Sequence, residues 1–132
     1  MAELSALDAL LGASIDVTDT VTIKRLNVDF KIKAITGSAL TKIREQATYP
    51  EGKGANRKMV VKEDEVGQLL IASACVEPNF ADTKLIAHYN AADAGDCVQK
   101  ALLAGEIALL QGAILDLSGF GGVVDEVEEV KN

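Results

Sequence analysis

The sequence contains no tryptophan, and aromatic residues make up only 4% of its 132 positions. Hydrophobic residues nevertheless account for 48% of the chain, so the core must consist of aliphatic side chains. A chain of this length has the usual size of one domain and buries roughly two thirds of its unfolded surface. We therefore expect one domain with one aliphatic core.

Cysteine and histidine are too scarce for the common metal and nucleophile sites. Only Cys75, Cys97 and a single histidine, His88, are present. Neither cysteine lies at zinc-ligand spacing from the histidine or from the other cysteine, so we expect no metal site. Cys75 lies in an apolar segment, where burial raises the pKa of a thiol, and no catalytic motif appears elsewhere. We expect free thiols in a reducing cytoplasm, no catalytic residue, no cofactor and no enzyme activity.

Basic residues are fewer than acidic ones: 13 lysine and arginine residues stand against 20 acidic residues, which gives a net charge of -7. This balance argues against binding to nucleic acid or to anionic membranes. No run approaches the roughly twenty apolar residues of a membrane span, and the N-terminus lacks the basic start and long apolar core of a secretory signal. The composition is typical of a soluble protein that stays monomeric or binds a basic partner.

The longest apolar-periodic run, residues 102–121, predicts the central helix of the fold. Four branched side chains recur at helical spacing on one face: Ile107, Leu110, Ile114 and Leu117. Gly119 is a candidate left-handed residue that ends the helix, with Leu115 and Phe120 as the apolar pair of a Schellman motif. We expect this helix to run from about Gly105 to Ser118.

An amphipathic segment near the N-terminus carries Leu4, Leu7 and Leu11 on one helical stripe, with Leu10 beside it and Gly12 at its end. It has about two turns and is too short to be stable alone. Two interpretations stay open: the segment packs on its own domain, or it docks on another subunit.

Residues 20–35 alternate in the manner of a β-hairpin with one solvated face. The side chains expected to point inward are Val21, Ile23, Val28, Phe30, Ile32 and Ala34, and the turn falls at Leu26-Asn27. Because two strands alone are marginal in water, helices must cover the apolar face. The predicted fold class is therefore α+β, with an N-terminal β-hairpin packed against a small bundle of about five helices.

Cap residues and apolar stripes predict the remaining helices of this bundle. They are 37–47 after Thr36, 63–76 with acidic residues at its start, 83–89 after Asp82, and 94–103 after Asp93. Phe80 lies in the connection after Glu77-Pro78-Asn79 and is expected to pack as an anchor. A phosphate-binding loop at Thr36 is disfavoured, because only Gly37 is present and Lys42 lies inside the helix.

Residues 49–62 predict a mobile basic loop, because Pro50, Gly52 and Gly54 interrupt any periodic pattern. The basic residues are Lys53, Arg57, Lys58 and Lys62, against a single acid, Glu51. The loop is either simply solvated or docks on an acidic neighbour such as the C-terminal tail of another copy, which would give self-association. A nucleic-acid site would need aromatic residues between the charges, and Tyr49 is the only one near them.

Residues 121–132 contain two glycines and four acids and predict a flexible acidic tail. Val123 or Val124, together with Val127 and Val130, could form a small amphipathic turn in it on binding. We expect a single domain over residues 1–120, with residues 1–19 as an N-terminal arm, followed by this tail.

Several of these segments together resemble the XkdN-like phage tail assembly chaperones. The resemblance rests on DALLG (8–12), the strand VTIKRL (21–26), the turn VEPNF (76–80) with Asp82 after it, and the ending LLAGEIALLQGAILDLSGFG (102–121). It spans nearly the whole chain. The sequence departs from the family where Ala104 stands in place of an expected proline, and where Ala92-Asp93 replaces an expected Thr-Pro helix start.

The resemblance implies a protein that binds the tape-measure protein of a phage or prophage tail, keeps that long helical chain soluble, and helps recruit tail-tube protein in the cytoplasm of the bacterial host. It implies absence from the finished tail. The alternative is a structural tail component or a small adaptor protein. The residues expected to contact a partner are Leu4, Leu7, Leu10, Leu11, Lys53, Arg57 and Lys58.

Overall fold

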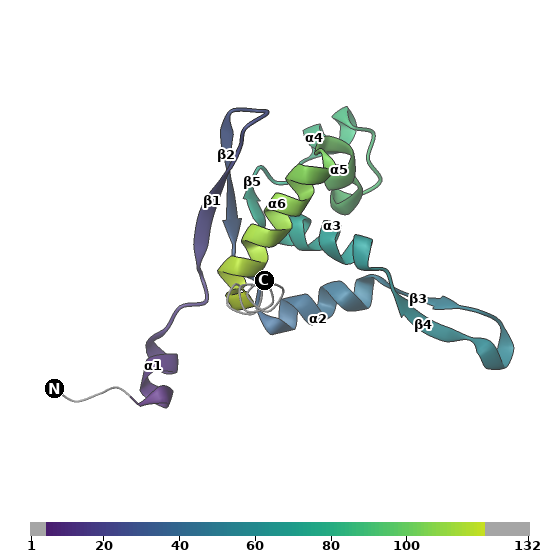
Figure 1. Ribbon diagram of the computed structural model, residues 1–132, viewed down its shortest axis with the longest axis horizontal. Helices are drawn as coiled ribbons and strands as arrows, with labels where there is room; N and C mark the ends of the chain where they lie inside the picture. Colours follow the sequence, from purple (N-terminus) through teal and green to yellow (C-terminus); the bar gives the residue numbers. More distant parts are fainter. Residues whose placement is uncertain (1–4, 121–132) are drawn as a thin grey trace, which may run out of the picture.

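A three-stranded antiparallel sheet lies beside a group of helices in the computed structural model, which describes residues 5–120 (Figure 1). In chain order the elements are α1 (Ala6–Gly12), β1 (Thr18–Ile23), β2 (Val28–Lys33), α2 (Gly37–Gln46), β3 (Thr48–Glu51), a 3-10 turn (Gly54–Asn56), β4 (Lys58–Val61), α3 (Glu63–Ala74), β5 (Cys75–Glu77), α4 (Thr83–His88), α5 (Ala94–Ala101) and α6 (Ala104–Leu115), which continues as a π-helical turn (Asp116–Phe120). The predicted α+β class, with a hairpin near the N-terminus followed by helices, is confirmed. Helices α2 to α6 form the predicted bundle, and α1 lies apart from it.

Strands β1 and β2 form the predicted hairpin, in which Val21 pairs with Phe30. Asn27 in the turn adopts a left-handed conformation with φ of 55°, which asparagine tolerates better than most residues. The sheet has a third strand, β5, that was not predicted. It pairs antiparallel with β2, so that Cys75 lies opposite Ile32. The preceding helix, expected to run to about Val76, ends two residues earlier at Ala74, because the next residues pair with β2.

The core lies between the inner face of this sheet and helices α3, α5 and α6. The largest fully buried side chains of the described residues are Phe80, Ile23, Ile32, Ile71, Leu110, Ile114, Val98 and Cys97. Phe80 is the predicted anchor, and its ring meets that of Phe30 edge to face with centroids 6.3 Å apart, a favoured aromatic geometry. Val28 was expected inside but is exposed, since it is the first residue of β2, beside the turn.

The predicted helix caps are present. Thr36 Oγ1 accepts a hydrogen bond from the Ala39 N–H at 3.2 Å, and the carboxylates of Asp82 and Asp93 cap α4 and α5 in the same way. These bonds satisfy backbone donors that the first helical turn leaves free. The predicted ends of α2, α4 and α5 fall within two residues of the observed ones.

The central helix ends as predicted at Gly119, whose φ of 100° is the left-handed conformation that favours glycine. Its last turn is π-helical and not α-helical, so the α-helix stops at Leu115 instead of Ser118. Ser118 makes two hydrogen bonds in this turn: its hydroxyl donates to the Ile114 carbonyl at 2.7 Å and accepts from the Ile35 N–H at 2.8 Å. The end of α6 is thereby tied to the residues that follow β2.

The segment expected to be a mobile loop is instead a second β-hairpin, made of β3 and β4, that projects from the helices (Figure 1). Its register pairs Thr48 with Val61 at the base and Glu51 with Lys58 at the tip. Gly52 and Gly54 have φ of 90° and 58° and let the chain reverse there. The glycines that suggested a loop therefore form the turn between two strands.

Candidate functional site

The described residues do not bring together the side chains of a metal site. Within residues 5–120 no group of three or more histidine, cysteine, aspartate or glutamate side chains is placed to hold a metal ion. Both cysteines are buried and free, as expected. Burial raises the pKa of the Cys75 thiol to about 12, which leaves it protonated and unreactive at neutral pH. Three surfaces of the described part of the chain are candidate sites.

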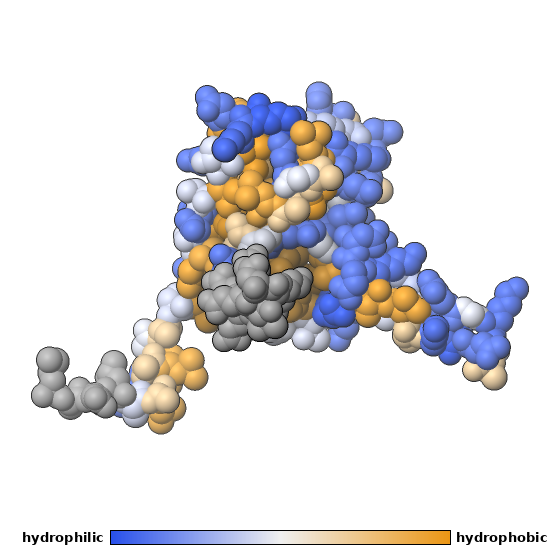
Figure 2. All heavy atoms as spheres, in the orientation of Figure 1, coloured by the Kyte–Doolittle hydropathy of each residue, from blue (hydrophilic) through white to orange (hydrophobic). Residues whose placement is uncertain are grey.

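The first surface is the N-terminal arm, whose helix α1 stands clear of the rest of the molecule (Figure 1). Ser5 caps the helix by accepting from the Asp8 N–H at 3.0 Å. None of the α1 residues is buried, and Leu7, Leu10 and Leu11 are 66%, 76% and 75% exposed. Figure 2 shows the corresponding apolar atoms in orange. The interpretation in which this segment packs on its own domain is therefore wrong for the described residues; Leu4 lies outside them.

The arm is attached to the sheet where β1 begins. The Val17 carbonyl accepts a hydrogen bond from the Ala34 N–H at 2.8 Å, which continues the pairing of β1 with β2 by one step. The chain between α1 and this bond carries another exposed apolar side chain, Ile15. The apolar surface of the arm thus extends beyond the leucines of α1.

The second surface is the tip of the β3–β4 hairpin, here called the basic tip, which carries Lys53, Arg57 and Lys58. All three side chains are exposed. At the base of the hairpin, the Lys62 ammonium lies 5.1 Å from the centre of the Tyr49 ring, within the range of a cation–π contact. The arm and the basic tip project from opposite sides of the molecule (Figure 1). The structure therefore gathers the predicted basic residues and separates them from the predicted leucines.

The third surface is an apolar groove of about 390 Å³ between α2, α3 and the end of α6. Its walls include Leu40, Val66, Leu70, Leu115 and Phe120. This volume falls within the usual range for binding pockets. The sequence did not indicate the groove, because three separate helices contribute its walls and each apolar residue alone fits a core position.

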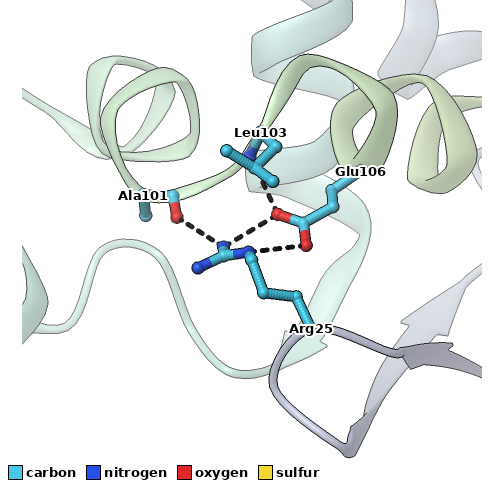
Figure 3. A network of polar contacts seen from close by, with 4 residues as sticks. All are labelled: Arg25, Ala101, Leu103 and Glu106. Atoms are coloured by element: carbon cyan, nitrogen blue, oxygen red, sulfur yellow. Dashed lines mark hydrogen bonds and ion pairs between the residues drawn. The ribbon is translucent and has the colours of Figure 1, made fainter.

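A polar network lies at the start of α6 (Figure 3). The Arg25 guanidinium, from the β1–β2 turn, makes two 2.8 Å bonds to the Glu106 carboxylate and a third, of 3.2 Å, to the Ala101 carbonyl. Glu106 also accepts from the Leu103 N–H at 2.8 Å, at the start of α6. The hydrogen bonds from Arg25 lower the pKa of Glu106 most, and the hydrogen bond from the Leu103 N–H lowers it further. The hairpin turn is thus joined to the junction of α5 and α6.

The fold is that of a small α+β protein with exposed apolar and basic surfaces. The chain belongs to the Phage XkdN-like tail assembly chaperone family, because the family model matches residues 7–131. No curated protein matches the chain. The structure resembles the crystal structure of the protein YqbN with a TM-score of 0.66 and 20% sequence identity, over 89% of this chain and 99% of that one. At this identity the likeness supports the fold alone.

Membership in the family assigns the chain to the phage tail assembly chaperones. The recognition made from the sequence segments is thereby confirmed. Among the described residues, no helix is long and apolar enough to cross a membrane.

Proposed function

We propose that this chaperone binds the tape-measure protein of the phage tail and keeps it soluble until the tail tube forms around it. The observation that carries the proposal is the exposed leucine stripe of α1, in a chain that belongs to a tail assembly chaperone family. A long helical partner with apolar seams aggregates unless another protein covers those seams. The arm offers an apolar helical face of this kind.

The energetics favour the leucines as the main contact. Full burial of an exposed leucine contributes about 1.5–3 kcal/mol, so Leu7, Leu10 and Leu11 together can outweigh the cost of ordering a short helix. The net charge of -7 keeps such a complex soluble. The basic tip, with Lys53, Arg57 and Lys58, would orient the chaperone against acidic segments of its partner.

The proposal extends to the remainder of the assembly pathway. The chaperone helps recruit tail-tube protein, works in the cytoplasm of the bacterial host, and is absent from the mature tail. In this proposal residues 1–120 act as one domain, with residues 1–19 as the arm that makes the contact.

Coexpression with the cognate tape-measure protein tests the proposal. The wild-type chain should raise the soluble fraction of that protein and co-purify with it, and Leu7→Asp with Leu11→Asp should abolish both effects. A matched control, Leu26→Asp with Leu109→Asp, changes two leucines that are exposed elsewhere and should behave as wild type. If wild type neither solubilises nor co-purifies with the tape-measure protein, the proposal is wrong. If the arm variant behaves as wild type, another surface makes the contact.

Mass spectrometry of purified virions tests the last part of the proposal. A chaperone that leaves during assembly should be missing from the particles, whereas a structural tail component should be abundant in them. Detection at the level of the tail-tube protein would favour the structural alternative.

A further inference from the structure

We propose that the apolar groove is a docking site for the acidic tail of the same chain, residues 121–132. Such a contact would cover the groove in the free chaperone, so that any other apolar segment would have to displace the tail. The proposal concerns a contact within one molecule and does not depend on the identity of the tape-measure protein as a partner.

The course of the chain places the start of the tail at the groove. Leu115 and Phe120 both lie in the groove wall, and Phe120 is the last residue that the structure describes. Gly119, with φ of 100°, reverses the chain immediately before it. The tail therefore begins at the rim, and its twelve residues can span up to about 40 Å when extended. A tether of this length gives an effective concentration in the millimolar range, so that even a weak contact forms.

The residues of the tail match the chemistry of the groove. After two glycines, the tail has Val123, Val127 and Val130 at helical spacing, with acidic residues between them. The groove supplies apolar walls from Leu40, Val66 and Leu70. Valine side chains can thus enter the groove while the carboxylates remain in water.

One basic residue, Arg44 on α2, lines the groove. Glu63 lines it too, and the two side chains form a 3.1 Å ion pair. The side chains of Arg44 and Glu63 are 46% and 69% exposed, and exposed ion pairs of this kind contribute little. The guanidinium can therefore turn toward a tail carboxylate such as Asp125 or Glu126 at small cost.

Paramagnetic relaxation in the full-length protein tests the proposal directly. A spin label on Asn132→Cys reports where the end of the tail lies, and because Cys75 and Cys97 are buried, we expect the introduced cysteine alone to be labelled in the native protein. We expect selective broadening of the amide signals of Leu40, Val66 and Leu70. The β1–β2 turn should be unaffected.

Matched variants in the labelled protein separate apolar docking from charge attraction. Val127→Asp with Val130→Asp should abolish the broadening at the groove, whereas Asp125→Asn with Glu129→Gln should retain most of it. On the groove side, Leu40→Asp should abolish the broadening and Leu109→Asp, on the outer face of α6, should not. An amide spectrum that otherwise matches wild type shows that each variant is folded.

Other occupants give different results, and each would overturn the proposal. Broadening centred on Arg57 at the basic tip, and lost on neutralising the tail, would mean an electrostatic contact instead. Broadening that appears only when spin-labelled protein is mixed with an isotope-labelled, unmodified copy would mean that a second molecule supplies the tail. Absence of selective broadening would mean that the groove is left free for another partner.

Discussion

Replacing Leu110 by alanine is the sharpest test of the architecture, because this residue is completely buried at the centre of α6. The helix packs there against α3 and β1. The substitution removes three buried carbon atoms, and a loss of about 0.8 kcal/mol for each gives about 2.4 kcal/mol. The cavity left behind adds to this loss, so the free energy of unfolding should fall by about 2–5 kcal/mol.

Urea unfolding, followed by far-ultraviolet circular dichroism, measures this change as a lower midpoint with the same slope. Leu109→Ala is the matched control, because it alters the neighbouring residue of the same helix, which is 49% exposed. It should cost about 1 kcal/mol or less, since surface substitutions have small effects. Equal shifts for the two variants, or no measurable shift for Leu110→Ala, would refute the placement of α6 at the centre of the core.

Three further predictions concern single contacts. Glu106→Gln should lower the urea midpoint at neutral pH, because the charged bonds from Arg25 are lost. The pKa of Glu106 in the folded protein lies below its ordinary value of 4.5. The extra stability of wild type over Glu106→Gln should therefore be present above that pH and disappear as the pH falls below it. Ala104→Pro should raise the free energy of unfolding by about 0.4–1 kcal/mol, because this is the first position of α6 and proline is tolerated there. Cys75 should resist a thiol reagent at pH 8 in the native protein and react at once in denaturant, as mass spectrometry would show.

Each of these predictions has an outcome that would contradict it. An unchanged difference between wild type and Glu106→Gln from pH 7 to pH 3 would mean that the carboxylate bonds of Figure 3 do not stabilise the fold. A destabilised Ala104→Pro variant would mean that the extended conformation of Leu103, with ψ of 156°, does not accommodate a following proline. Rapid modification of native Cys75 would mean that its segment opens readily.

The sequence was informative wherever a structural feature depends on a few neighbouring residues. Thr36, Asp82 and Asp93 are identifiable as caps because each side chain bonds a backbone N–H two or three residues further along. Gly119 is identifiable as the end of a helix because its conformation is unfavourable for other residues. The β1–β2 hairpin follows from alternation over two adjacent segments.

Strand pairings that the local sequence pattern does not mark could not be obtained in this way. Strand β5 has three residues and forms because β2 offers it a partner, whereas its own sequence continues the apolar pattern of α3. The β3–β4 hairpin contains Pro50 and Gly52, which are typical of loops, and proline is tolerated in a strand at a sheet edge. In both cases the backbone hydrogen bonds are made to another strand, and local propensity does not determine whether that strand is present.

For the candidate surfaces too, some properties follow from the sequence and others depend on the fold. The sequence by itself determined which residues form the leucine stripe and the basic cluster, because amphipathic spacing and charge are properties of the chain. Only the tertiary structure decided that Leu7, Leu10 and Leu11 remain exposed and that α2, α3 and α6 enclose an apolar groove. The physical reason is that an apolar stripe needs burial against some surface, and which surface is free depends on how the other elements have already filled the core.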